Sequence, residues 1–476
     1  MLAIALFALP LLLAALAAVV RDDVRPRLVP LAGVAHLALT GTALYVGDVA
    51  AFDGWLELDA LGQLVLLVIS VLFFACSIYV PSYLRLRRDR PNRLFCVALL
   101  VSLGMMTLMA ESQHLGLMWV ALEASTLACA PLLYFNRHAR SLEATWKYIV
   151  IGAVGIALAL LGSFFLAYSA LSAGKDTSLL FGDLVHQAPQ LAKPWVHAAF
   201  VLLFVGYGTK IGLAPMHSWK PDAYGEAPAV VGALLAGGVT ACAFLALVRF
   251  VDIAGAAGDG KFAHDLMIRI GLVSMAIGGV FMARQRDVKR MLAYSSVEHM
   301  GILVLGVGIG GLALYGAMLH LVANALTKGV MFLSAGNLQR AYGSKSTEIL
   351  RGAIRRTPVS ASLLLAGFFA VTASPPFAMF LSEFTIVRGT IASGHYAIAA
   401  IFLFLAFVVF VGMGATTITI VQGKPPDDLP PLKYRDTFAT VFPPMLLLVA
   451  LVALGLYVPA PLDRMLHAAA DLLGAR

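Results

Sequence analysis

The chain has few charged residues: Asp, Glu, Lys and Arg make up only 13% of its 476 residues, whereas 60% are hydrophobic. A soluble domain of this length needs many more polar side chains to cover its surface, so the composition excludes an ordinary soluble protein. Because a bilayer-spanning helix needs roughly 20 apolar residues, the sequence predicts an all-α polytopic membrane protein with about fourteen transmembrane helices. The predicted spans are residues 1–20, 28–46, 60–80, 94–110, 115–135, 145–171, 195–215, 228–250, 266–283, 292–310, 312–335, 359–387, 396–421 and 438–458.

Cysteine is scarce as well. The four cysteines lie inside predicted spans without CxxC spacing, which indicates neither a disulfide nor a metal site. The chain also lacks a Rossmann glycine pattern, a P-loop and an H-E-x-x-H motif, so we expect no bound nucleotide and no cofactor. A basic region before the first apolar run is missing too. Met1–Val20 is therefore predicted to be a retained first helix and not a signal peptide.

The net charge of +8 is explained by basic loops on one side of a membrane, and we expect no nucleic-acid partner. Loops after even-numbered spans are short, neutral or acidic, whereas arginines cluster after odd-numbered spans. The cluster after the third span is Arg85, Arg87, Arg88, Arg90 and Arg93. By the positive-inside rule, the loops after odd-numbered spans face the cytoplasm and both termini lie on the outer side.

One segment, Val205–Pro228, places a lone lysine in an apolar helix and reads VGYGTKIGLAPMHSWKPDAYGEAP. Gly212 and Pro215 follow Lys210, and proline has no N–H while its ring crowds the preceding turn, so the helix is predicted to break there. A membrane helix breaks only where protein or a water-filled cavity satisfies the freed carbonyls. A cation beside such a break indicates an ion path, and His217 just beyond it is a possible proton entrance.

Other ionisable residues inside the predicted spans are interpreted as partners of Lys210. Glu123 stands midway along span five, where a charged side chain facing lipid would cost about 2.5–3.5 kcal/mol. Lys147 lies four residues after Glu143 and can pair with it on one helical face. Lys147 either snorkels to the membrane interface or lines a proton entrance.

Spans ten and eleven carry a second polar group. Glu298 and His299 are adjacent and therefore project about 100° apart on a helix, so we expect them to face different neighbours. Histidine titrates nearest physiological pH, which suits proton relay. His320, Asn324 and Lys328 recur every four residues along one helical face. This stripe indicates a wet interior path, although a buried hydrogen bond is the alternative role for any one of them.

Span twelve repeats the arrangement of span seven, because Pro375 and Pro376 interrupt it before Glu383. Two proline-broken helices five spans apart, each bearing a buried charge, predict an internal structural duplication. Since this offset is odd, the second repeat is inverted relative to the first. The predicted parts are N-terminal packing helices at 1–92, a first five-helix repeat at 93–250, a second, inverted five-helix repeat at 251–423 and a C-terminal helix at 424–476.

These motifs resemble the antiporter-like subunits shared by respiratory complex I, multi-subunit sodium/proton antiporters and membrane-bound nickel–iron hydrogenases. The resemblance covers about Arg93–Gly423, and its most specific stretches are KIGLAPMHSWKPDAYGEAP and RDVKRMLAYSSVEHMGI. The SSVEHMG, WVALEASTLA and SLEATWKYI stretches are most similar to hydrogenase-4 component F. Complex I subunits usually carry a small residue where Glu298 stands.

The resemblance implies a role for several residues. It implies that Glu123 pairs with Lys210, that Lys328 with His320 is the central relay, and that Glu383 is the exit. Complex I subunits carry a relay lysine where this chain has Ala241, and Asn324 stands where a relay histidine is common. Water, or Glu298 and His299, would have to bridge that gap; otherwise the chain conducts poorly and acts as a structural spacer.

The implied function is proton translocation, by a Glu/Lys/His relay, within a redox-driven hydrogenase-4-like, formate hydrogenlyase-like or complex I-like assembly. The chain itself is expected to catalyse no reaction. Expected partners are protons, the lipid bilayer of a bacterial or archaeal inner membrane, and other antiporter-like, quinone-module or hydrogenase-module subunits. A sodium/proton antiporter, an inorganic-carbon uptake subunit and a non-conducting scaffold are the alternatives. Sodium would call for paired carboxylates, whereas the sequence shows single ones.

Overall fold

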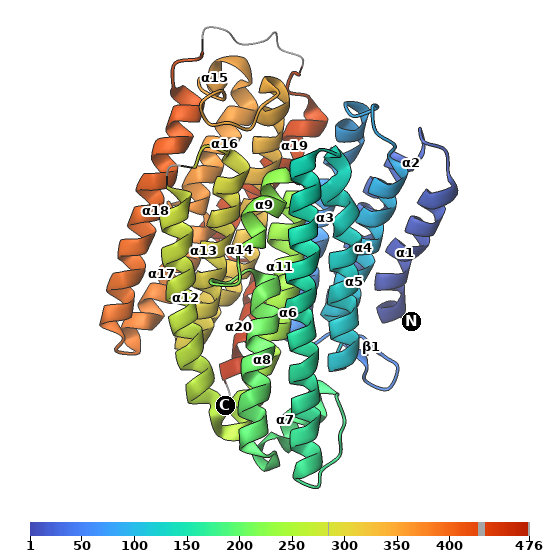
Figure 1. The fold of residues 1–476 in the computed structure, drawn as a ribbon, viewed down its shortest axis with the longest axis vertical. Helices are drawn as coiled ribbons and strands as arrows, with labels where there is room; N and C mark the ends of the chain where they lie inside the picture. The colour runs from blue at the N-terminus through green and yellow to red at the C-terminus, as the bar shows by residue number, and fades with distance from the viewer. Residues whose placement is uncertain (284, 427–433, 475–476) are drawn as a thin grey trace.

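The computed structural model describes residues 1–283, 285–426 and 434–474. The chain forms a bundle of long helices whose axes run roughly along the longest dimension of the molecule (Figure 1). The first six long helices are α1 (Leu2–Val19), α2 (Arg25–Val46), α3 (Ala60–Arg85), α4 (Arg93–Glu111), α5 (Leu115–Leu133) and α6 (Ala139–Ser172). Short elements join them or follow them: β1 (Ala50–Ala51), β2 (Leu56–Glu57), η1 (Tyr134–Asn136), α7 (Phe181–Gln187) and η2 (Ala188–Gln190).

The middle of the chain contains the first interrupted helix. Its elements are α8 (Lys193–Ile211), α9 (Trp219–Glu226), α10 (Ala229–Leu234), η3 (Leu235–Val239), α11 (Thr240–Ala254), η4 (Gly255–Asp259), α12 (Gly260–Met282), α13 (Val288–Ile309) and α14 (Gly311–Tyr342). Gly258 has a φ of +80° at the kink between α11 and α12. Glycine adopts this left-handed conformation without a steric penalty, so the chain turns there.

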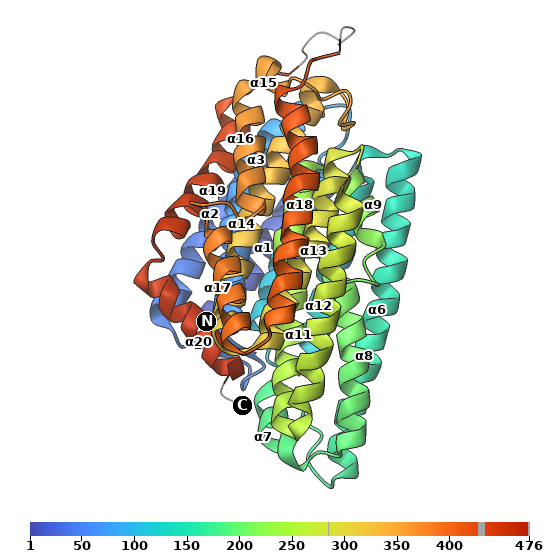
Figure 2. The same cartoon turned by 90° about the vertical axis from the view of Figure 1, so that its left-hand side faces the viewer.

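The last third of the chain contains the second interrupted helix. Its elements are α15 (Ala353–Arg356), α16 (Pro358–Val371), α17 (Ala378–Ala392), α18 (Tyr396–Gln422), α19 (Phe438–Leu456) and α20 (Ala460–Gly474). The predicted C-terminal helix corresponds to α19, and residues 427–433 and 475–476 of the 424–476 segment lie outside the described residues. Helix α20 was not predicted, because Asp463 and Arg464 interrupt its apolar residues. Figure 2 shows α19 and α20 on the face opposite to α6 and α8.

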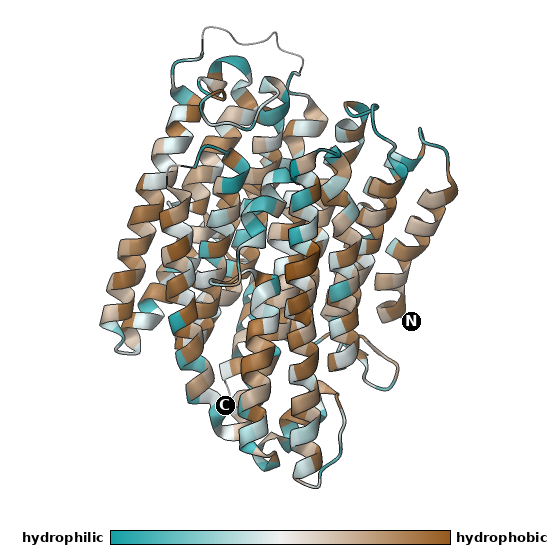
Figure 3. Ribbon diagram, viewed as in Figure 1, coloured by the Kyte–Doolittle hydropathy of each residue, from teal (hydrophilic) through white to brown (hydrophobic). Residues whose placement is uncertain are grey.

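The helices confirm a polytopic membrane protein. Eleven helical stretches in the described part of the chain are long and apolar enough to cross a membrane, and Ala229–Met282 counts as one of them. The interrupted helices, α8–α9 and α16–α17, are not among the eleven, so the total of fourteen stays a prediction. Figure 3 shows hydrophobic ribbon along the helices and hydrophilic ribbon gathered around α15 and the loop between α3 and α4, at one end of the bundle.

Helices α6 and α8 pack closely because each contributes a glycine at the contact. A Cβ added at Gly206 of α8 would lie 2.6 Å from the Gly155 carbonyl oxygen and 2.7 Å from the Ala159 Cβ atom of α6. No side chain fits there without moving a helix. This contact lies one turn before Lys210, so it also sets where the end of α8 sits against α6.

We expect Gly206→Ala to destabilise the protein by about 1–3 kcal/mol, because the added methyl overpacks the α6–α8 contact. The matched control is Gly182→Ala in α7, where an added Cβ meets no atom within 4 Å. Thermal melting of the detergent-solubilised protein measures both variants. Equal melting temperatures for Gly206→Ala and Gly182→Ala would contradict the close contact.

Candidate functional site

The first cluster of buried charges joins α5 to the end of α8. The Lys210 Nζ atom lies 2.6 Å from Glu123 Oε2 and donates a hydrogen bond to Thr126 Oγ1 at 3.2 Å. The side chains of Lys210 and Glu123 are 4% and 16% exposed. A Cβ at Gly152 of α6 would lie 3.0 Å from Lys210 Nζ, so this glycine leaves room for the ammonium group. The sequence placed both residues inside the bundle, and the structure brings them into contact.

The predicted break follows Lys210 directly. Helix α8 ends at Ile211, and Gly212 takes the left-handed conformation that commonly ends a helix. The freed backbone groups find protein partners: Trp219 Nε1 donates to the Thr209 carbonyl at 2.9 Å, and the Ala214 N–H donates to Ser274 Oγ at 2.9 Å. These contacts are what an interrupted helix requires inside a membrane.

The two candidate entrance residues lie differently. Lys147 is 42% exposed and pairs with Glu143 at 2.6 Å and with Asp222 of α9 at 2.7 Å. Asp222 also pairs with Arg290 of α13 at 3.1 Å. His217 is partly buried in the loop before α9, and its Nδ1 atom has no hydrogen-bond partner among the described residues. Lys147 therefore belongs to an ionic network over α9, and His217 stands apart from it.

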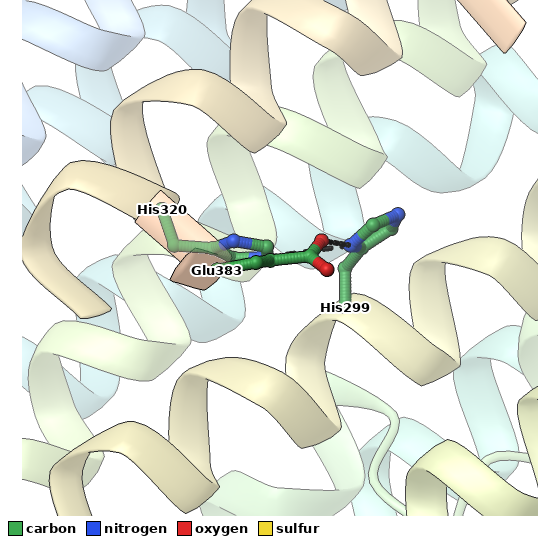
Figure 4. Close-up of side chains that lie close together, drawn as sticks. All are labelled: His299, His320 and Glu383. Atoms are coloured by element: carbon green, nitrogen blue, oxygen red, sulfur yellow. Dashed lines mark hydrogen bonds and ion pairs between the residues drawn. The ribbon is translucent and has the colours of Figure 1, made fainter. Parts of the chain in front are cut away.

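A second cluster combines three helices. His299 of α13, His320 of α14 and Glu383 of α17 converge, as Figure 4 shows. His299 Nδ1 lies 3.3 Å from His320 Nε2 and 3.9 Å from Glu383 Oε1, and His320 Nδ1 lies 3.0 Å from Ser382 Oγ. All three are buried. The interruption between α16 and α17 ends just before this cluster, in the same relation that α8 and its break have to the first.

Glu298 and Lys328 complete the second cluster. Lys328 Nζ donates to Ser295 Oγ at 2.7 Å, and Glu298 Oε2 lies 3.4 Å from His299 Nε2. The expectation that Glu298 and His299 face different neighbours was wrong for their charged ends. The Glu298 Cβ atom packs against Gly278 of α12, yet its carboxylate reaches back to the adjacent ring because a glutamate side chain is long and flexible.

The positions where the chain departs from the resemblance are both buried. Ala241 of α11 is 1% exposed, and Asn324 of α14 is 2% exposed. The side-chain oxygen of Asn324 has no hydrogen-bond partner within the described residues. Neither residue joins the two clusters. Among the described residues no hydrogen bond or ion pair links Glu123 or Lys210 directly to the second cluster.

The second cluster also has the donor set of a metal site. One ligand atom each from His299, His320 and Glu383 lie within 4.8 Å of one another. Two imidazoles and a carboxylate are ligands that suit Zn²⁺. The sequence indicated no metal site, because these residues come from three helices and have no local spacing motif.

Sequence reasoning missed one buried charge. Lys220 of α9 is 0% exposed, and its Nζ atom donates to Ser296 Oγ of α13 at 3.1 Å. The available signal was a second lysine in the segment around the break, flanked by Trp219 and Pro221.

The comparisons with known proteins agree with this architecture. Residues 112–409 match the profile of the family described as NADH:quinone oxidoreductase/Mrp antiporter, TM. The chain belongs to this family. It is 34% identical over 360 residues to a hydrogenase-4 component F homolog of Methylacidiphilum infernorum, which covers 74% of each chain. It is also 34% identical over 365 residues to F(420)H(2) dehydrogenase subunit N of Methanosarcina mazei, covering 74% of this chain and 72% of that one.

The fold is shared with a solved structure over nearly its whole length. A chain of the membrane-bound sulfane sulfur reductase, an archaeal respiratory membrane complex, superposes with a TM-score of 0.89. The overlap covers 99% of this chain and 97% of that chain at 23% identity. The family resemblance read from the sequence motifs is therefore confirmed, and this antiporter-like chain is a multi-pass membrane subunit.

Proposed function

We propose that this antiporter-like subunit moves protons across the membrane within a redox-driven complex of the hydrogenase-4 or complex I type. Membership of the family supports proton translocation. The observation that carries the proposal is the ion pair between Lys210 and Glu123, 2.6 Å apart and buried beside a helix break. Burying two charges costs several kcal/mol of desolvation per ion, and ionisable residues inside a membrane typically mark an ion path.

The finer fold belongs to the same proposal. Fourteen crossings would form packing helices at 1–92, inverted five-helix repeats at 93–250 and 251–423, and a C-terminal part at 424–476. The interruptions between α8 and α9 and between α16 and α17 support two equivalent halves, because each lies beside one cluster of buried ionisable residues. Inverted repeats typically place the ion site at their interface.

The orientation follows from charge. The loop between α3 and α4, rich in arginine, and helix α15 lie at one end of the bundle (Figure 1). The two termini lie toward the other end in both views. The positive-inside rule then places the basic end in the cytoplasm and both termini outside, in the cell membrane of a bacterium or archaeon.

The proposed route begins near Lys147 or His217 and passes to the pair of Glu123 and Lys210. From there the proton moves to the second cluster and leaves at Glu383. The members of that cluster are Glu298, His299, His320, Lys328 and Glu383. Water completes the route wherever two groups lie further apart than a hydrogen bond.

The driving step is electrostatic. While Glu123 is ionised beside it, Lys210 keeps its proton, since a pair at about 4 Å interacts by roughly 4 kcal/mol at an effective dielectric near 20. A movement in a neighbouring subunit that separates the pair leaves a buried ammonium without its carboxylate. That state is unfavourable, so Lys210 passes its proton inward.

The partners follow from the relatives, which are subunits of larger membrane complexes. We propose further antiporter-like subunits and a quinone-binding or hydrogenase module as neighbours of this chain. Affinity purification through a tag on this chain, followed by mass spectrometry, identifies that module and its electron donor.

Sodium/proton exchange is the second candidate, and one observation favours it. The carboxylates of Glu298 and Glu383 approach the same histidine, His299, at 3.4 and 3.9 Å. The sequence showed single carboxylates because these two come from different helices. Paired carboxylates are the ligands that a hard cation prefers.

We expect proton uptake by the purified complex in liposomes to continue when choline replaces sodium, because the relay groups carry protons. Uptake is driven by the electron donor of the co-purifying module and measured with a pH-sensitive dye. A protonophore should abolish the pH gradient, and liposomes without the complex are the control. Uptake that requires sodium would assign this chain to sodium exchange instead.

A further inference from the structure

A buried lysine lies between the two clusters, and the route above does not use it. Lys220 stands in α9, which packs against both α6 and α13; both views place α9 between these two helices (Figures 1 and 2). Its side chain is fully buried, and no carboxylate among the described residues lies within 4 Å of its Nζ atom. A position that needed only packing would hold an apolar residue, since a buried unpaired ammonium is costly.

On one side Lys220 touches the end of the helix that carries Lys210. A Cβ built on Gly212 would lie 2.5 Å from Lys220 Cδ, 2.8 Å from Cε and 3.2 Å from Nζ. The aliphatic part of Lys220 therefore lies directly across Gly212, two residues after Lys210. Only a glycine leaves this space, and its φ of +76° is also the conformation that glycine favours. The helix break and the buried lysine thus fit together.

On the other side Lys220 reaches the helix of the second cluster. Its Nζ atom donates to Ser296 Oγ at 3.1 Å, while Lys328 donates to the adjacent Ser295 Oγ at 2.7 Å. Both serines are fully buried in α13. The charge of Lys328 acts on Lys220, and the charge of Lys220 acts on His299. Two positive charges repel strongly in a low-dielectric interior, so the pair of lysines is suited to hold one proton at a time.

We propose that Lys220 is the relay residue that carries the proton from the cluster of Glu123 and Lys210 to the cluster of Lys328. The ammonium of Lys210 gives one proton, through water, to the neutral amine of Lys220. The ammonium of Lys220 then gives one proton to the neutral amine of Lys328, and each donor is left as a neutral amine. No electron moves, and no other reactant is needed. This proposal rests on the proposed proton translocation.

The test is Lys220→Met in the complete complex, with electron transfer and proton uptake measured on the same liposomes. We expect uptake per electron to fall about tenfold or more, because a positioned proton donor is lost. Lys220→Arg should fail as well, since arginine keeps the charge but does not release its proton. Uptake at the level of the unmodified complex in either variant would overturn the proposal.

The matched control is Lys289→Met. Lys289 of α13 is also buried, 1% exposed, but its Nζ atom donates to the Ala227 carbonyl at 2.8 Å and lies outside the route. We expect unchanged uptake per assembled complex; a loss equal to that of Lys220→Met would assign the effect to buried charge in general and overturn the proposal. If Lys220→Met does not assemble, Ser296→Ala decides, since it removes only the acceptor of Lys220. Slower uptake supports the relay, and unchanged uptake overturns it.

The two proposals fail separately. If Lys210→Met stops proton uptake while Lys220→Met does not, the relay through Lys220 is wrong and the proposed function stands. If neither variant changes uptake, the proposed function itself fails.

Discussion

Replacing Lys210 with methionine is expected to lower proton uptake by the complete complex about a hundredfold, the effect of losing a positioned acid–base group. The ammonium of Lys210 lies 2.6 Å from Glu123 Oε2, and this pair is the group that the driving movement separates. Glu123→Gln should have a similar effect. The double variant should lose little more than either single variant, because residues that act as one unit are not additive. Uptake is measured in liposomes with a pH-sensitive dye and expressed per electron transferred.

Lys193→Met provides the control for this variant, because Lys193 begins the same helix, α8, and is exposed. It loses the same charge without touching the buried pair, so proton uptake should stay unchanged. Normal uptake in Lys210→Met and Glu123→Gln, with the complex fully assembled, would refute the proposed role of the pair.

Replacing Arg249 with methionine is expected to destabilise the protein by about 3–5 kcal/mol, the typical cost of removing one partner from a buried ion pair. Arg249 of α11 is 0% exposed, and its Nη2 atom lies 3.0 Å from Asp59 Oδ2. Its Nη1 atom also donates to the Ser112 carbonyl at the end of α4. Asp59 in turn accepts the Gly62 N–H at the start of α3, at 2.6 Å. One guanidinium group thus holds three helices together.

The measurement is the amount of folded protein in the membrane, together with thermal melting in detergent. Arg286→Met is the control, because the Arg286 side chain is 86% exposed and pairs with Glu348 only at 3.9 Å. Such surface pairs contribute about 0–1 kcal/mol. Adding Asp59→Asn to Arg249→Met should restore part of the stability, since it removes the unpaired charge while an asparagine still caps α3. A melting temperature of Arg249→Met equal to that of Arg286→Met would show that the buried pair does not stabilise the fold.

The candidate site was only partly predictable. Lys210, Glu123 and Glu383 were recognised because a charge in an apolar span is costly wherever it faces lipid. The spacing of His320 and Lys328 on one helix placed them on one face. The direct contact between Glu298 and His299 was missed, because backbone direction does not determine where a long side chain ends. Lys220 was missed because the residues near it in sequence suggested a loop.

The sequence alone determined that this chain lies in a membrane, because apolar residues in runs of about twenty are stable only there. It also determined where two helices break, since proline and glycine act on their own backbone. Its motifs identified the family. The tertiary structure alone decided which buried charges meet, such as Glu298 and Glu383 at one histidine and Lys220 between Gly212 and Ser296. These contacts join helices far apart in the chain, and the packing of whole helices, which no local pattern encodes, sets their distances.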